Sequence, residues 1–167
     1  MGRLETEYEE WNTPIIGAYL IWQFAVAYVE NNKTENAPNI IEILYSYVLL
    51  TDKNYIKHIN GYRKNFASYI TAFNQHKETD LLSNFSSKLL SKREYAMRAV
   101  DIAVSAGLLG WDTDSASLVP IMKLKENKGS KKMGTEVQKI AKSAKILGKW
   151  LANEDFSTIT SALGVVL

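Results

Sequence analysis

A long apolar stretch at residues 14–29 constrains the fold more than any other feature of the sequence. It begins at Asn12-Thr13-Pro14, which is typical of a helix start, because the side chain before a first-turn proline caps free backbone N–H groups. Apolar side chains leave almost no polar face on this helix, and the stretch is too short to span a bilayer. We therefore expect a buried central helix that ends near Asn31.

Apolar residues at helical spacing predict further helices along the rest of the chain. We expect them near residues 38–50, 52–60, 62–75, 79–90, 91–106, 135–153 and 156–163. Two of them begin at capping boxes, in which a hydroxyl and a later Glu or Gln satisfy free N–H groups. These boxes are Ser91 with Glu94, and Thr135 with Gln138.

The pattern changes after Gly107, which we expect to end a helix. Residues 108–112 and 117–121 flank a polar turn and predict two short strands. Two helices followed by a small hairpin give the outline of a winged helix. We therefore predict a mainly α fold: a compact helical domain with a winged-helix-like lobe, a hairpin near 108–122, and C-terminal helices. The expected parts are 1–78, 79–122 and 123–167, packed as one unit.

Composition excludes several classes of protein. The chain has 167 residues, of which 46% are hydrophobic and 23% charged, so it is long enough to bury a core. It has no cysteine, which excludes disulfides, thiol nucleophiles and cysteine-based zinc sites and fits a reducing compartment. The first residues are acidic and polar, unlike a signal peptide. We therefore expect a cytoplasmic protein with no membrane segment.

No catalytic motif emerges. The only two histidines, His58 and His76, have no carboxylate at metal-binding spacing, and we expect both at the surface. No serine lies in a nucleophile elbow. The glycine-rich residues 129–135 lack a phosphate-loop lysine after the second glycine, and Glu136 would repel phosphate. We therefore predict no catalytic residue, no metal ligand and no cofactor; a small enzyme is the weakest hypothesis.

Lysines gather in the C-terminal part of the chain. Residues 123–149 hold nine lysines and two glutamates. In the helix expected from residue 135, lysines fall on one side and apolar residues on the other, which is typical of a solvated face opposite a core. They could also contact phosphates or an acidic partner, without base readout, because no arginine or aromatic residue lies among them. The candidate contacts are Lys128, Lys131, Lys132, Lys139, Lys142, Lys145 and Lys149.

Aromatic and apolar residues near the ends of elements are candidates for protein contacts, although core packing is the alternative for each. The candidate partner-interface residues are Trp11, Asn12, Trp111, Trp150, Phe156, Leu163 and Val165. Gly148 weakens its helix, so we also predict that another backbone, from this chain or from a partner, approaches it closely.

Several landmarks together resemble a known family. Residues 11–14 are Trp-Asn-Thr-Pro, residues 106–109 are Ala-Gly-Leu-Leu, residues 146–151 are Ile-Leu-Gly-Lys-Trp-Leu, and residues 163–165 are Leu-Gly-Val. With the Ile/Leu-rich helix at 40–50, the chain resembles the middle component of bacterial three-component ABC systems, the group that includes Lamassu-type phage defence. It departs from the family pattern at Phe156, where no proline begins the helix, and at Val166, where a basic residue is usual.

The resemblance implies a role and partners. In such systems an SMC-like ATPase senses nucleic acid, an effector such as a nuclease causes damage, and the middle component joins or restrains them. We therefore expect a non-catalytic adaptor whose partners are the ATPase and the effector, with non-specific DNA contact as a further possibility. The alternative is a free-standing winged-helix DNA-binding regulator, which would need base-reading residues on the helix before the hairpin.

Overall fold

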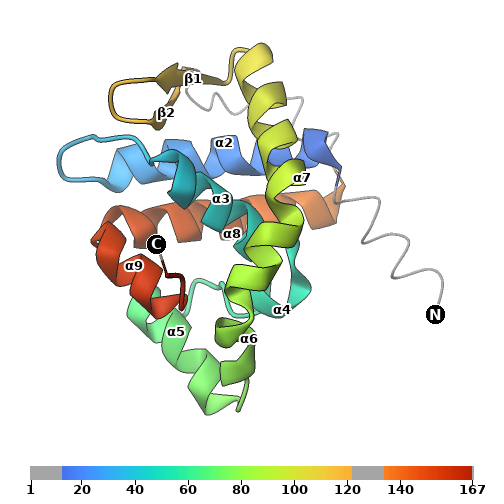
Figure 1. The fold of residues 1–167 in the computed structure, drawn as a ribbon, viewed down its shortest axis with the longest axis vertical. Helices are drawn as coiled ribbons and strands as arrows, with labels where there is room; N and C mark the ends of the chain where they lie inside the picture. The colour runs from blue at the N-terminus through green and yellow to red at the C-terminus, as the bar shows by residue number, and fades with distance from the viewer. Residues whose placement is uncertain (1–12, 122–133, 167) are drawn as a thin grey trace.

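A computed structural model describes residues 13–121 and 134–166 of the chain (Figure 1). These residues form eight helices and one two-stranded antiparallel sheet, so the predicted mainly α fold with a small hairpin is confirmed. The helices are α2 (Pro14–Asn31), α3 (Ile40–Thr51), α4 (Lys53–Ile56), α5 (Phe66–Gln75), α6 (Thr79–Ser83), α7 (Phe85–Ser105), α8 (Thr135–Ala152) and α9 (Phe156–Ala162). The strands are β1 (Leu109–Asp112) and β2 (Ser117–Pro120).

Helix α2 is the centre of the fold, as its apolar sequence predicts. The Thr13 hydroxyl caps it by accepting a hydrogen bond from the Ile16 N–H at 3.4 Å. The helix packs against α3, α7 and α8, and most of its residues are buried. Figure 1 shows α2 and α8 running across the molecule with α3 and α7 crossing them. Covering the helix on several sides removes its nearly continuous apolar surface from water.

Side-chain caps set where α3 and α5 begin. Asn39 and Glu42 form a capping box at the start of α3, so this helix begins close to the predicted position. Asn65 forms another with Ser68, and α5 therefore begins at Phe66 rather than near residue 62 as predicted. Asn65 accepts the Ser68 N–H at 2.9 Å, a bond that holds the residues before it outside the helix.

The predicted helix start at Ser91 is wrong. Helix α7 runs without interruption from Phe85 to Ser105, and Ser91 lies inside it. The Ser91 hydroxyl donates to the Lys88 carbonyl oxygen at 2.9 Å, a bond that a serine within a helix makes readily. The break lies earlier, at Asn84, between α6 and α7.

The capping box predicted at Thr135 is also wrong. Gly134 occupies the N-cap position of α8, where it has no side chain to cap the helix, and Thr135 is already helical. The acidic first turn of α8, which contains Glu136, provides favourable charge at the helix N-terminus instead.

The hairpin follows α7 at the place that the sequence predicts. Gly107 has φ of +74°, a left-handed conformation that ends the helix and favours glycine. Strands β1 and β2 then pair from Leu109 with Pro120 to Asp112 with Ser117. The predicted order of two helices and a hairpin within 79–122 is present, although α6 has only five residues. Residues from all three predicted parts of the chain contribute to one hydrophobic core.

Candidate partner interface

Helix α8 carries an exposed lysine face opposite a buried apolar face, as its sequence predicts. Its buried residues include Ala141, Ala144, Leu147 and Leu151, and the helix packs closely on α2. Lys139, Lys142, Lys145 and Lys149 are all exposed. We call these four residues the α8 lysine face; the other candidate contacts, Lys128, Lys131 and Lys132, lie outside the described residues. Only the arrangement is confirmed, and contact with nucleic acid or an acidic protein stays a prediction.

The described ion pairs leave most of this face free of nearby carboxylates. Lys139 lies 3.6 Å from Glu136, and both side chains are well exposed, so the pair is largely screened by solvent. Among residues 13–121 and 134–166, Lys142, Lys145 and Lys149 have no carboxylate within salt-bridge distance. The α8 lysine face therefore offers positive charge that the described part of this chain does not neutralise.

Trp150 lies inside the fold rather than at its surface. Only 3% of the residue is exposed, and its ring centroid is 5.6 Å from that of Tyr69 in α5. Helical spacing places Trp150 at the edge of the apolar face of α8, and α5 extends the core over that edge. In this structure the side chain anchors α8 to α5 and is not available to a partner.

Helix α9 is held against α3 by its own side chains. The Phe156 ring is stacked at 6.3 Å on Tyr45, and the hydroxyls of Tyr45 and Thr160 are hydrogen-bonded at 3.1 Å. Leu163 is fully buried, whereas Phe156 and Val165 are partly buried against the core. Among these candidate contacts, Phe156 and Val165 therefore retain some surface. Trp11 and Asn12 lie outside the described residues.

Trp111 is the one candidate aromatic residue that the described structure leaves well exposed. It lies on β1 with 42% of its surface accessible to solvent. Val119 and Ile121, on or beside β2, are also exposed, so one small hairpin carries three large apolar side chains in contact with water. The pairing of Trp111 with Leu118 and of Gly110 with Val119 places Trp111 on one face of the hairpin and Val119 and Ile121 on the other. Exposed apolar groups of this kind are a recurring feature of protein interfaces.

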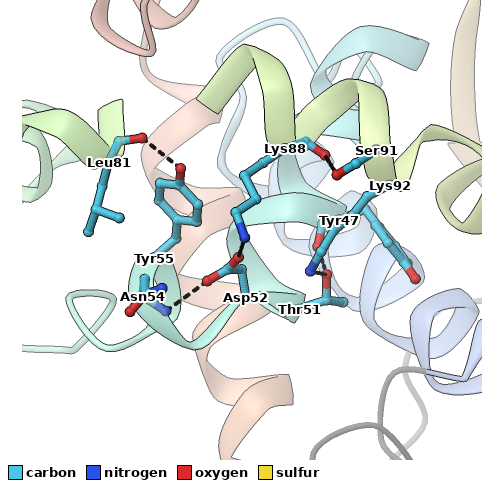
Figure 2. A network of polar contacts seen from close by, with 9 residues as sticks. All are labelled: Tyr47, Thr51, Asp52, Asn54, Tyr55, Leu81, Lys88, Ser91 and Lys92. Carbon is cyan, nitrogen blue, oxygen red and sulfur yellow. Dashed lines mark hydrogen bonds and ion pairs between the residues drawn. The ribbon is translucent and has the colours of Figure 1, made fainter. Parts of the chain in front are cut away.

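A polar network fixes α7 to the junction of α3 and α4 (Figure 2). Buried Asp52 caps α4 by accepting the Asn54 N–H at 2.9 Å, and its other oxygen lies 3.4 Å from the Lys88 ammonium. Lys92, one turn further along α7, donates to the Thr51 hydroxyl at 3.2 Å. Burial lowers the pKa of Lys92, while Asp52 opposes the shift. The network holds the two segments together.

Local sequence patterns do not reveal this network, because it joins residues far apart in the chain. No local spacing relates Asp52 to Lys88, and only the packing of α7 across α3 brings them together. Tyr55 strengthens the same region by donating its hydroxyl to the Leu81 carbonyl oxygen at 2.6 Å. Each side chain in Figure 2 that is joined by a dashed line therefore has its partner within this chain.

A cavity of about 610 Å³ lies between the hairpin, the 32–39 loop and the start of α9. Its lining includes the carboxylates of Glu35, Glu42 and Asp112 and contains no lysine or arginine among the described residues. Glu42 is buried, accepts the Asn39 N–H at 2.9 Å and accepts the Tyr28 hydroxyl at 3.1 Å. Burial raises the pKa of Glu42, and these two hydrogen bonds oppose the shift.

The expectation that both histidines lie at the surface is wrong for His58. This residue is buried, its ring is stacked on that of His76 at 5.0 Å, and its Nε2 lies 3.4 Å from Glu78 Oε1. Burial lowers the pKa of His58, with Glu78 opposing the shift. His76 is exposed. The described residues contain no group of three or more potential metal ligands.

No helix in the described parts of the chain is both long and apolar enough to cross a membrane. The chain matches, over residues 1–167, the sequence model of the family described as ABC-three component (ABC-3C) system Middle Component 3. The protein belongs to this family. No curated protein and no solved structure matches the chain.

A middle component acts with the other components of its ABC three-component system, so its exposed surfaces are the places to look for contacts. In this middle component the described candidates are the α8 lysine face and the apolar side chains of the hairpin. They lie on different elements, and the hairpin contacts α2, α3 and α7.

Proposed function

We propose that this middle component is a non-catalytic adaptor in a cytoplasmic, Lamassu-type antiphage defence complex. It joins an SMC-like ATPase to an effector of the nuclease class, and restrains that effector until the ATPase senses foreign nucleic acid. The observation that carries the proposal is the family match over residues 1–167. The two separate candidate surfaces support it, because an adaptor must contact two partners.

Electrostatics supports a further contact within the same proposal. The α8 lysine face can bind DNA held by the ATPase or an acidic surface of a partner. Lysine provides point charges on flexible stems, so such contact would be independent of sequence and sensitive to salt. Binding of this kind suits an adaptor that works beside a nucleic-acid sensor.

The alternative, a free-standing winged-helix regulator, has less support. A recognition helix needs one face free to enter a groove and suited to phosphate. Helix α7 buries Ala96, Ala99 and Val100 in the core, and its exposed residues mix Arg93 and Arg98 with Glu94 and Asp101. The acidic residues would repel the DNA backbone, so we propose the adaptor ahead of the regulator.

Co-expression with the neighbouring gene products tests the proposal. We expect the tagged middle component to co-purify with both the ATPase and the effector, and to hydrolyse no ATP and cut no nucleic acid alone. A preparation of the single chain whose turnover tracks with the protein through purification would contradict the non-catalytic role. Binding to one operator-like DNA sequence in the absence of both partners would favour the regulator.

A further inference from the structure

Asn60-Gly61 is the only Asn-Gly dipeptide in the sequence, and it lies in the segment between α4 and α5. A glycine after an asparagine leaves its own backbone nitrogen accessible to the asparagine side chain, because it has no Cβ to stand in the way. Gly61 is exposed, Asn60 is half-buried, and the neighbouring Tyr62 is 97% exposed. Water can therefore reach this dipeptide.

The side chain of Asn60 is folded over the backbone nitrogen of Gly61. Its Oδ1 accepts the Tyr62 N–H at 3.1 Å, which closes an Asx turn. The ring of atoms in such a turn includes the nitrogen of the middle residue, so the turn holds the Asn60 Cγ close to the Gly61 nitrogen. The Tyr62 N–H is also placed to stabilise negative charge that develops on Oδ1 when a nucleophile attacks Cγ. The turn thus brings a nucleophile and an activated carbonyl carbon together.

Contacts on both sides hold this turn in the folded protein. Ile59, directly before the dipeptide, is buried in the core. Arg63 donates from Nε to the His58 carbonyl oxygen at 3.1 Å and from Nη1 to the Ser68 carbonyl oxygen at 3.3 Å. These bonds tie the residues after the dipeptide both to the residues before it and to α5. The turn is therefore part of the folded structure.

We propose that Asn60 is a site of spontaneous deamidation in the folded chain, with water as the co-reactant. The Gly61 nitrogen bonds to the Asn60 Cγ, the Cγ–Nδ2 bond breaks, and ammonia leaves with the proton of the Gly61 N–H. Water then opens the resulting succinimide at either of its carbonyl groups, which gives aspartate or isoaspartate at position 60. The inference goes beyond the proposed adaptor function and does not depend on it.

Either product changes the corner between α4 and α5. Each adds one negative charge to a segment that also contains Arg63 and Lys64. Isoaspartate in addition lengthens the main chain of the turn by one carbon. That carbon falls between His58 and Arg63, the two residues that the 3.1 Å hydrogen bond joins. We therefore expect isoaspartate to loosen this corner.

Ageing of the purified full-length chain tests the site, with an unaged sample digested in parallel. Trypsin cleaves after lysine and arginine and releases residues 58–63, in which Asn60 is the only asparagine. We expect this peptide to gain about 1 Da and to split into two chromatographic species. The gain should be faster at higher pH, because the attacking nitrogen must lose its proton.

The adjacent tryptic peptide, residues 65–77, provides an internal control. It contains exposed Asn65, whose Oδ1 also accepts a backbone N–H, at 2.9 Å. The residue after Asn65 is Phe66, whose side chain hinders attack by its backbone nitrogen. We therefore expect Asn65 to stay unmodified while Asn60 reacts.

Gly61→Ala is the most direct variant. The added Cβ has no described atom within 4 Å, so the variant should melt like the wild type. The same Cβ hinders approach of the nitrogen to Cγ, and we expect deamidation of Asn60 to slow by about tenfold or more. Asn60→Gln is a second variant, in which a longer side chain has to close a six-membered ring, and it should nearly stop the mass gain.

Comparison with the chain unfolded in guanidinium chloride shows whether the fold permits the reaction. We expect the folded chain to deamidate at Asn60 at a rate within about fivefold of the unfolded chain, because the turn keeps the reacting atoms close. A folded chain that keeps Asn60 intact while the unfolded chain reacts would overturn the inference. Mass gain that is unchanged in Gly61→Ala, or that is equal in residues 65–77, would also overturn it.

Discussion

Gly148 of α8 lies so close to Phe24 of α2 that a Cβ at Gly148 would stand 2.5 Å from the Phe24 carbonyl oxygen. The same Cβ would be 2.9 Å from the Ala27 Cβ and 3.0 Å from the Tyr28 nitrogen. The missing side chain lets the two helices touch through their backbones. The backbone approach predicted from the sequence is therefore made by this chain itself.

Substitution of Gly148 by alanine should destabilise the protein although alanine favours helix by about 1 kcal/mol. The new methyl group would overlap backbone atoms of α2, which cannot move as a flexible side chain can. We expect Gly148→Ala to lower the free energy of unfolding by more than about 1 kcal/mol in urea titration. Gly61→Ala is the control, because nothing lies within 4 Å of its Cβ position. An alanine variant as stable as the wild type would contradict the close approach.

The C-terminal segment should stabilise the core of this chain. Leu163 is fully buried, so Leu163→Ala should cost about 2–5 kcal/mol of unfolding free energy through lost burial and a cavity. Val166, at 94% exposure, provides the matched control, and Val166→Ala should leave the melting temperature unchanged. Calorimetry of the two variants decides the point. Equal melting of both would mean that α9 does not stabilise the core.

Burial of His58 should make stability depend on pH. Its pKa in the folded protein is lowered from the usual 6.5, so between the two pKa values the unfolded chain binds more protons. The free energy of unfolding should therefore carry no penalty from His58 above about pH 6.5. It should fall as the pH decreases from there towards the pKa of His58 in the folded protein. The raised pKa of Glu42 acts in the opposite direction, because its contribution is lost as pH rises.

The variant His58→Gln isolates the histidine from Glu42. We expect the difference in unfolding free energy between wild type and variant to shrink or reverse as the pH falls from about 7.5 to about 5.5. His76→Gln is the control at an exposed position. A difference that does not vary over this range would show that His58 is not held neutral by the fold.

The sequence predicts elements that are governed by local rules. Thr13 and Pro14 begin α2, Gly107 ends α7, and the alternation of lysines with apolar residues along α8 gives its two faces. In each case the signal and the structure it determines lie within a few residues of each other. For the same reason the hairpin after Gly107 is predictable in place and length.

The predictions that are wrong concern features that depend on contacts between distant parts of the chain. The Ser91 box matches a helix start in sequence, but α7 packs against the core on both sides of Ser91, through buried Phe85 and Ala96 and partly buried Leu89, and continues through it. Trp150 lies at the edge of a helical face, and its burial depends on Tyr69 in another helix. The pairing of residues 38–40 with β2 could not be predicted either, because it joins segments far apart in the chain.

The α8 lysine face should account for any affinity for nucleic acid within the described residues. We expect weak binding to a short DNA duplex, independent of sequence and lost at high salt. The triple change of Lys142, Lys145 and Lys149 to Glu should abolish it in fluorescence anisotropy. Changing Lys53, Lys64 and Lys77, also exposed, to Glu alters the net charge equally and should have a much smaller effect. Equal losses in both triple variants would assign the binding to net charge rather than to this face.

Reconstitution of the chain with the ATPase and effector encoded beside it tests the adaptor role most directly. The purified components are mixed in pairs and all together, and their masses are measured by light scattering after size exclusion. We predict that the middle component binds each partner and that the ATPase and effector associate only when it is present. An ATPase–effector complex that forms equally well without this chain, while the chain elutes alone, would contradict the account.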